Sequence, residues 1–254
     1  MALLKSTGLC KYFGGVHAVD EVDFEVEKGE KVGLIGPNGA GKTTLFNVIT
    51  GFLRADSGIV EYKGNNIVGL RADQVAQMGI ARTFQIPVQF RGQTVFENLL
   101  AGHIKEERKN FWHALFNTRD YREEQERARQ KALEVLEFVG LADWKDRLVD
   151  VLPDGLRRFL SLGRVLMMSP ELLLLDEPLA GLSEEEISAL LSKLDELQGQ
   201  GTTIFMIEHR MKAVMRFCPR IMVLNYGRKI AEGSPTEVKD DPVVINAYLG
   251  TREG

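Results

Sequence analysis

The chain has 254 residues, of which 44% are hydrophobic and 27% charged, as in one large globular domain or a domain with an insertion. Its 32 basic and 36 acidic residues are interspersed and give a formal net charge of −4, which excludes the broad basic surface of a nucleic-acid-binding protein. No apolar run approaches the roughly 20 residues of a membrane span and no signal peptide is present, so we expect a cytosolic chain that does not itself cross a membrane.

The N-terminal part of the chain is predicted to be mainly β structure. Val22, Phe24 and Val26 alternate with acidic residues, which is the period of a half-buried strand. The further strands predicted in this part are residues 32–35, 58–62 and 80–84.

From about Val95 to Leu166 the pattern becomes helical. The clearest helix is predicted at residues 121–139, where apolar side chains recur at helical spacing and Gly140 is expected to end the helix. Its charge run, residues 122–127, is interpreted as a solvated helix face rather than a binding patch.

Strand signals then return. Apolar strands are predicted at residues 172–176 and 202–207, with a helix at about 184–197 between them. This strand–helix–strand order predicts a parallel sheet that is covered on both faces. A hairpin turn is expected at residues 225–228, and a final short helix is expected to end near residues 249–250.

A glycine-rich segment, residues 36–43, lies between an apolar strand and a helix start, and this is the setting of a phosphate-binding loop. Glycines let successive backbone N–H groups surround an anion, and the helix N-terminus adds partial positive charge. Lys42 is predicted to bring its charge to the β- and γ-phosphates, and the Thr43 hydroxyl to coordinate Mg²⁺. The nucleotide-binding residues predicted in this phosphate loop and directly after it are Gly36, Pro37, Asn38, Gly39, Ala40, Gly41, Lys42, Thr43 and Thr44.

Two carboxylates and a histidine follow later strands. Asp176 is predicted to hold Mg²⁺, directly or through water, and Glu177 to accept a proton from the water that attacks the γ-phosphate. His209 follows another apolar strand, at the edge where ligands bind in open α/β sheets, and is predicted to contact the γ-phosphate. The alternatives are a helix cap or surface loop for the acidic pair and a structural role for the histidine.

Gln85 ends the apolar segment that leads into the helical part. It is predicted to ligate Mg²⁺ or to position water, and its alternative is a simple polar strand end. Lys42, Glu177 and His209 form the predicted catalytic set.

These elements, in this order and spacing, resemble the ATP-binding subunit of ABC transporters over essentially the whole chain. The segments that carry the resemblance are the phosphate loop, Thr83-Phe84-Gln85, Leu175-Asp176-Glu177-Pro178, Ile207-Glu208-His209 and residues 233–238. Finer features resemble the branched-chain amino acid branch of that family, and they lie at residues 13–15, 47–52, 82–85, 97–100, 180–182 and 247–250.

The resemblance implies an α/β fold: a P-loop NTPase core with a mostly parallel sheet, an antiparallel β subdomain and a helical insertion. The core and the β subdomain are expected at residues 1–85 and 161–254, and the helical subdomain at 86–160. In the family two such subunits sandwich two ATP molecules, with Mg²⁺, between the phosphate loop of one and a signature segment of the other. Phe13 matches the aromatic residue that stacks on adenine, and a core phenylalanine is its alternative.

The resemblance also implies the partners. These are a second ABC ATPase subunit, transmembrane permease subunits whose coupling helix docks on the helical insertion, and indirectly an extracytoplasmic solute-binding protein, but no nucleic acid. The chain would attach peripherally to the cytoplasmic face of the membrane through the permease. ATP hydrolysis would then energise import, with branched-chain or related amino acids as the expected solutes.

One segment departs from the family pattern. In the family the signature segment has a sequence close to Leu-Ser-Gly-Gly-Gln. In this chain the same segment is Leu152-Pro153-Asp154-Gly155-Leu156. Leu152 and Gly155 match and are predicted to face the partner's nucleotide. Pro153 removes a hydroxyl and a backbone N–H, and Asp154 adds negative charge near the phosphate. Two lost donors are expected to slow hydrolysis by roughly two to four orders of magnitude. Ser183 is a smaller departure, since many relatives carry aspartate there.

The departure leaves more than one assembly open. In a homodimer both nucleotide sites would be weak, whereas in a heterodimer only the site that uses this signature would suffer, and we favour the heterodimer. The alternative function is a catalytically weak, regulatory ATP-binding half.

A soluble ABC ATPase acting on DNA or ribosomes is disfavoured because the chain has no second cassette and no long coiled-coil insertion. A GTPase lacks support because no Asn-Lys-X-Asp segment is present, and a small-molecule kinase would leave Asp176, Glu177 and His209 unexplained.

Overall fold

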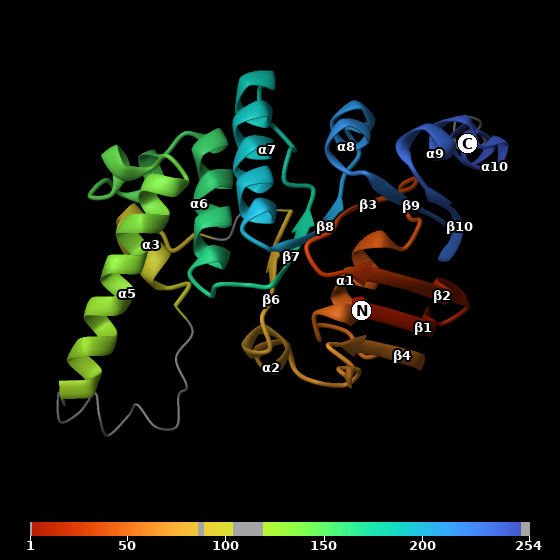
Figure 1. Cartoon of the computed structure of the whole chain (residues 1–254), viewed down its shortest axis with the longest axis horizontal. Helices are drawn as coiled ribbons and strands as arrows, with labels where there is room; N and C mark the ends of the chain where they lie inside the picture. The colour runs from red at the N-terminus through yellow and green to blue at the C-terminus, as the bar shows by residue number, and fades with distance from the viewer. Residues whose placement is uncertain (1, 86–88, 104–118, 250–254) are drawn as a thin grey trace. The chain divides into compact units, whose positions relative to one another are not determined.

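The computed structural model describes residues 2–85, 89–103 and 119–249 (Figure 1). The chain divides into two units. Unit 1 comprises Met1–Arg82, Glu171–Ala180 and Leu194–Gly254, and unit 2 comprises Thr83–Pro170 and Gly181–Lys193. Part of the predicted helical stretch, residues 104–118, lies outside the described residues, as does Gly250.

A six-stranded sheet forms the centre of unit 1, with the strand order β10-β9-β3-β8-β7-β6. Strands β9, β3, β8 and β7 run parallel, and β10 is antiparallel to β9. Every residue of β7 and of β8 is buried, as expected for a parallel sheet covered on both faces. The bounds are β3 Lys31–Ile35, β6 Ile80–Thr83, β7 Leu172–Asp176, β8 Thr203–Ile207, β9 Arg220–Asn225 and β10 Arg228–Gly233.

A second, antiparallel sheet of unit 1 has the order β2-β1-β4-β5. In β2 the side chains of Val22, Phe24 and Val26 are buried and their neighbours exposed, so the alternation predicted from the sequence is confirmed. The bounds are β1 Ala2–Phe13, β2 Val16–Glu27, β4 Ser57–Tyr62 and β5 Asn65–Asn66.

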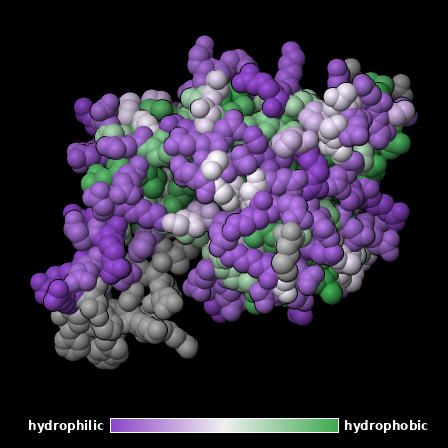
Figure 2. Space-filling view, in the orientation of Figure 1, coloured by the Kyte–Doolittle hydropathy of each residue, from purple (hydrophilic) through white to green (hydrophobic). Residues whose placement is uncertain are grey.

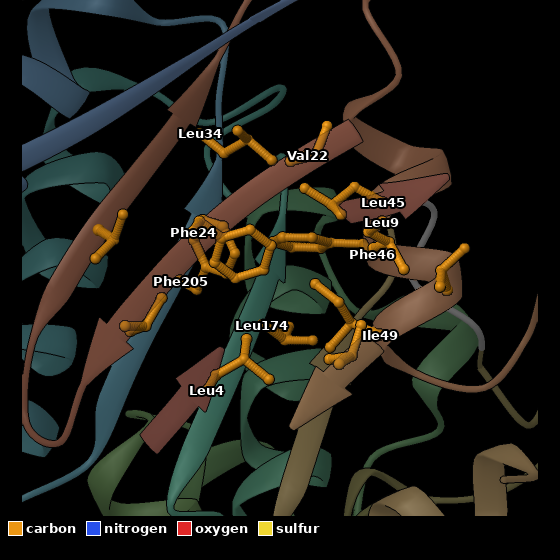
Figure 3. Packing of buried hydrophobic residues seen from close by; sticks show 14 of the residues in the cluster. Leu4, Leu9, Val22, Phe24, Leu34, Leu45, Phe46, Ile49, Leu174 and Phe205 are labelled. Carbon is orange, nitrogen blue, oxygen red and sulfur yellow. The ribbon is translucent and has the colours of Figure 1, made fainter. Parts of the chain in front are cut away.

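The main core of unit 1 joins both sheets to helix α1 (Lys42–Ile49) (Figure 3). The ring of Phe205 on β8 lies 5.1 Å from that of Phe46 on α1 and 5.6 Å from that of Phe24 on β2, measured between centroids. On the other face of β3, a Cβ at Gly33 would lie 2.7 Å from Val214 of α8 (Met211–Phe217). The central strand is therefore covered by α1 on one face and by α8 on the other.

The three-ring contact predicts a large stability effect. Phe205→Ala is expected to lower the free energy of unfolding by about 3–5 kcal/mol, because it leaves a cavity between both sheets and α1. Urea unfolding followed by circular dichroism measures the change. Phe52→Ala is the control, since that ring is 54% exposed and its loss should cost less than about 1 kcal/mol. Equal losses in the two variants would contradict this account of the core.

Unit 2 is mainly helical. Ala128, Ala132 and Leu136 of α5 are buried, as the sequence predicted, and the surface over the first part of this helix, at the lower left of Figure 2, is mostly hydrophilic. Leu141 donates its backbone N–H to the Leu136 carbonyl at 2.8 Å, and Gly140 has φ 74°, so the predicted glycine end of the helix is confirmed. The helices of this unit, with α7 continuing beyond it, are α3 Val95–Leu100, α5 Arg119–Phe138, η1 Ala142–Trp144, η2 Val149–Val151, α6 Asp154–Leu166 and α7 Glu184–Gly199.

The other helices of unit 1 are short, and they are α2 Ala72–Gln77, α9 Pro235–Asp240 and α10 Pro242–Leu249. Within residues 2–85, 89–103 and 119–249, no helix combines the length and the apolar character that crossing a bilayer requires.

Candidate functional site

Three parallel strands of unit 1 end side by side, and predicted site residues follow each of them. Leu34 of β3 and Asp176 of β7 both pair with Ile207 of β8. The phosphate loop follows β3, Glu177 follows β7, and His209 comes two residues after β8. Because the carboxyl ends of parallel strands share one edge, the sheet brings these predicted residues together.

The phosphate loop requires glycine at two positions by geometry. Gly36 has φ 149°, and a Cβ there would lie 2.1 Å from the Leu224 carbonyl oxygen. Gly41 has φ 101°, and its Cβ would lie 2.0 Å from the Ala18 carbonyl oxygen. The loop backbone therefore packs directly on neighbouring strands, with no room for side chains at these points.

Lys42 lies inside the loop and is only 5% exposed. Its Nζ donates to the carbonyl oxygens of Gly36 at 2.8 Å and Pro37 at 2.9 Å. Burial lowers the pKa of this ammonium, while the nearby carboxylates of Glu177 and Asp176 act in the opposite direction. A cation is thus held inside the loop, whose exposed tip consists of Asn38 and Gly39.

The tip of the loop and the start of α1 face solvent. Asn38, Gly39 and Thr43 are exposed, whereas Ala40 is buried and Thr44 is half-buried. Helix α1 begins after Gly41, so its first backbone N–H groups and the Thr43 hydroxyl lie at the same end of the helix. This arrangement provides donors and a hydroxyl ligand for a bound phosphate group.

The β9–β10 turn supports the loop, a contact that the sequence did not predict. Gly227 donates its N–H to the Ala40 carbonyl at 3.0 Å and accepts from the N–H of Asp20 at 2.9 Å. A Cβ at Gly227 would lie 2.5 Å from the His17 carbonyl oxygen. The residues 225–228 were predicted as a hairpin turn, and the turn also connects β2 to the phosphate loop.

Asp176 ends β7 with its side chain 3% exposed. Arg82, at β6, donates from Nη2 to Asp176 Oδ2 at 2.6 Å, and its own side chain is 4% exposed. A buried carboxylate is costly without such a counter-charge. The sequence did not predict this arginine as a site residue.

Glu177 and His209 lie in direct contact. Glu177 Oε1 is 3.0 Å from His209 Nε2, and the proton on this contact depends on the tautomer of the histidine. Glu177 has φ 49°, a conformation uncommon outside glycine, and its backbone N–H is fixed by the Ile207 carbonyl at 2.9 Å. The backbone thus turns sharply after β7 and directs the carboxylate towards the histidine.

Glu208 is a further residue whose role the sequence did not reveal. It is 2% exposed and accepts from the backbone N–H groups of Leu179 at 2.6 Å and His209 at 3.0 Å. Burial raises the pKa of its carboxyl group, and these donors partly oppose that shift. Glu208 therefore joins the segment after β7 to the one after β8, and so fixes the backbones that carry Glu177 and His209.

Phe13 lies at the end of β1, paired with Val16 at the start of β2. Its side chain is 48% exposed, so it is not part of the core. Lys11 Nζ lies 5.4 Å from the centre of its ring. An exposed aromatic face of this kind is available for stacking.

The predicted residues Gln85, Leu152 and Gly155 belong to unit 2. The Gln85 carbonyl accepts a hydrogen bond from Arg158 Nη1. Leu152 is 2% exposed, so its side chain packs internally, and its carbonyl accepts from Arg157 Nε at 2.8 Å. A Cβ on Gly155 would overlap the carboxylate of Glu186 in its present position.

The signature segment forms the start of α6. Pro153 is the N-cap residue and offers no side-chain hydrogen bond to the helix. Asp154 is 93% exposed and lies 3.0 Å from Arg157, one helical turn later. The negative charge expected at this position therefore has a positive neighbour within the same helix.

The donor set of unit 1 is compatible with Mg²⁺. Asp176 supplies a carboxylate and Thr43 a hydroxyl, which are the hard oxygen ligands that Mg²⁺ prefers. Among the described residues, no group of three or more His, Cys, Asp or Glu side chains has the arrangement of a metal site. At nucleotide sites Mg²⁺ is usually held by one or two side chains together with phosphate oxygens and water.

Comparisons with known proteins agree with this geometry. Residues 19–180 match the ABC transporter family, and residues 228–254 match the C-terminal family described as branched-chain amino acid ATP-binding cassette transporter. The high-affinity branched-chain amino acid transport ATP-binding protein LivG of Salmonella typhimurium is 42% identical, over 98% of each chain. LivG of Escherichia coli K12 is 41% identical over the same shares.

Solved structures give the same result. The nucleotide-free ATP-binding cassette of an ABC transporter superposes with a TM-score of 0.85 at 36% identity, over 98% of this chain and 99% of that one. A cassette in its ADP conformation gives 0.85 at 35% identity, with the same coverage. The predicted α/β ABC ATPase fold is thereby confirmed. The chain belongs to the ABC transporter family, as one of its nucleotide-binding, ATP-hydrolysing subunits.

Proposed function

We propose that this chain is the ATP-binding and hydrolysing subunit of an importer for branched-chain or related amino acids. The relatives named for branched-chain amino acid transport cover nearly the whole chain, and the match at residues 228–254 points to the same branch. The observation that carries the hydrolytic part of the proposal is the contact of Glu177 with His209 at 3.0 Å, at the sheet edge that also holds the phosphate loop.

Each predicted site residue has a separate role in the proposed reaction. Backbone N–H groups of the phosphate loop and Lys42 bind the phosphates, and Phe13 stacks on the base. Glu177 accepts the proton of the attacking water, while His209 orients this carboxylate and contacts the γ-phosphate. Thr43, Asp176 and Gln85 are the proposed holders of Mg²⁺, which supplies charge neutralisation on the phosphates when bound.

The proposed assembly is a heterodimer. A second ABC ATPase subunit with an intact signature segment would complete the nucleotide site of this chain, while Pro153 and Asp154 weaken the site that this chain completes. We further propose that the helical subdomain, residues 86–160, docks on transmembrane permease subunits at the cytoplasmic face. An extracytoplasmic solute-binding protein would deliver the solute to the permease.

A second candidate function follows from the same segment. Because Pro153 offers the helix no cap and no N–H, this chain is a candidate for a regulatory half that binds ATP and hydrolyses little. Comparing ATP binding with turnover separates the two functions, since a regulatory half binds without catalysing even beside an intact partner.

Lys42→Ala tests the binding function. The variant should bind Mg-ATP about tenfold to a hundredfold more weakly in calorimetry, because a charge-assisted contact to phosphate is lost from the centre of the loop. Lys63→Ala removes an exposed lysine of the same unit and should bind like the unaltered chain. Absence of Mg-ATP binding by the well-folded unaltered chain would refute the proposed function.

A further inference from the structure

Arg82, Asn47 and Thr50 lie in the segments 47–52 and 82–85, which carry the family resemblance, yet the proposed mechanism gives them no part. The structure brings all three together inside unit 1. Arg82 Nη1 donates to Asn47 Oδ1 at 2.6 Å and to Thr50 Oγ1 at 3.3 Å, while its Nη2 donates to Asp176 Oδ2 at 2.6 Å. One buried guanidinium thus connects helix α1, which follows the phosphate loop, to the last residue of β7.

The surroundings of Arg82 fix its position. Its side chain is 4% exposed, and the guanidinium carbon lies 5.7 Å from the centre of the Phe46 ring on α1. The planar guanidinium offers donors in fixed directions, so binding Asn47 on one side determines where it meets Asp176 on the other. A lysine in its place would keep the charge but act as a single point, and would not reach both elements.

We propose that Arg82 is a positioning residue that sets the Asp176 carboxylate relative to the phosphate loop and thereby tunes divalent-cation binding. The inference rests on the proposed function, because it assigns Asp176 to the Mg²⁺ site. Asp176 Oδ2 is committed to Arg82, so the guanidinium decides which way the carboxylate faces. The Asn47 anchor ties that orientation to the same helix that carries Thr43, the second predicted ligand.

Arg220 is another arginine of unit 1 that forms a two-point pair with a carboxylate. Arg220 bonds the carboxylate of Glu30 through Nε at 2.6 Å and Nη2 at 2.7 Å. Glu30 precedes β3 and Arg220 begins β9, so this pair lies where these parallel strands start, whereas the phosphate loop follows the end of β3. Arg220→Lys therefore removes a two-point arginine pair from the same unit without touching the proposed metal ligands. It is the matched control for Arg82→Lys.

The test measures metal binding without hydrolysis. The probe is Mn²⁺, a paramagnetic stand-in for Mg²⁺, titrated by electron paramagnetic resonance into each variant loaded with ATP. Arg82→Lys is expected to weaken Mn²⁺ binding by about tenfold, the size of one charge-assisted hydrogen bond, while ATP affinity in EDTA stays within about twofold. Arg220→Lys is expected to leave both values unchanged.

A second variant covers the case in which Arg82→Lys does not fold. Asn47→Ala keeps the Arg82–Asp176 pair and the weaker contact with Thr50, and removes only the Asn47 acceptor, at a half-buried position of α1. It should weaken Mn²⁺ binding by about threefold, a neutral hydrogen bond being weaker than a charged one. Unchanged or tighter Mn²⁺ binding in the folded variants overturns the positioning role. Failure of the unaltered chain to bind ATP in EDTA or with metal would instead overturn the proposed function.

Discussion

Glu177→Gln is expected to reduce ATP turnover by about a hundredfold to ten-thousandfold and to leave ATP affinity within about twofold. The amide has the shape of the carboxylate and keeps a contact with His209, whose Nε2 lies 3.0 Å from Oε1 of Glu177. It has lost the basic oxygen that accepts a proton from the attacking water. Binding survives because the phosphate loop and Lys42 are unchanged.

The measurement separates chemistry from binding. Turnover is assayed beside a related ATPase subunit with an intact signature segment, so that the site under test is complete, and affinity is measured by calorimetry on the chain alone. Glu171→Gln makes the same chemical change at the residue before β7, where the carboxylate pairs with Lys63 on the surface. This control should retain full turnover. Unchanged turnover in Glu177→Gln would exclude Glu177 as the base.

Much of the fold could be predicted from local patterns. The alternation at Val22, Phe24 and Val26 sets one face of a strand, and the apolar strands β7 and β8 show the full burial that their composition indicates. Gly140 ends α5 because its positive φ suits glycine. These features depend on neighbours within a few residues, so the sequence alone is sufficient to predict them.

The site was predicted where chemistry follows a strand directly, as at Glu177 and His209, which the structure places in contact. It was missed where the contact joins distant segments. Arg82 and Asp176 are 94 residues apart, and nothing in either local pattern indicates that they meet. Nor does the sequence indicate a role for Glu208, because its carboxylate accepts hydrogen bonds from backbone N–H groups whose positions only the fold determines.

In the signature segment the structure pairs Asp154 with a positive charge that the local pattern did not indicate. Asp154 was expected to place negative charge near a phosphate, but it lies 3.0 Å from Arg157 on the same helix face. An exposed ion pair of this kind stabilises the helix by at most about 1 kcal/mol. The positive charge of Arg157 nevertheless offsets the negative charge of Asp154 that a bound phosphate would meet. Pro153, which caps α6 without a side-chain hydrogen bond, then becomes the main source of the predicted weakness.

Restoring the segment should therefore restore hydrolysis. The double variant Pro153→Ser with Asp154→Gly is expected to raise the ATPase rate of the lone chain by roughly two to four orders of magnitude, since two donors return to each site of a homodimer. Pro153→Ser alone should give most of this gain. Pro153→Ala, which returns the N–H but not the hydroxyl, should give an intermediate gain. Steady-state phosphate release measures all four rates.

Two controls make the gain specific. Adding Glu177→Gln to the double variant should abolish the new activity, because the restored donors serve a site whose base has been removed. A serine at the N-cap also stabilises the helix by about 0.5–2 kcal/mol, so thermal unfolding must be compared between the variants. Robust turnover by the unaltered lone chain would show that Pro153 does not weaken the site. No gain in the folded double variant would show that the missing donors do not limit the reaction, and the regulatory role would then have to rest on another part of the interface.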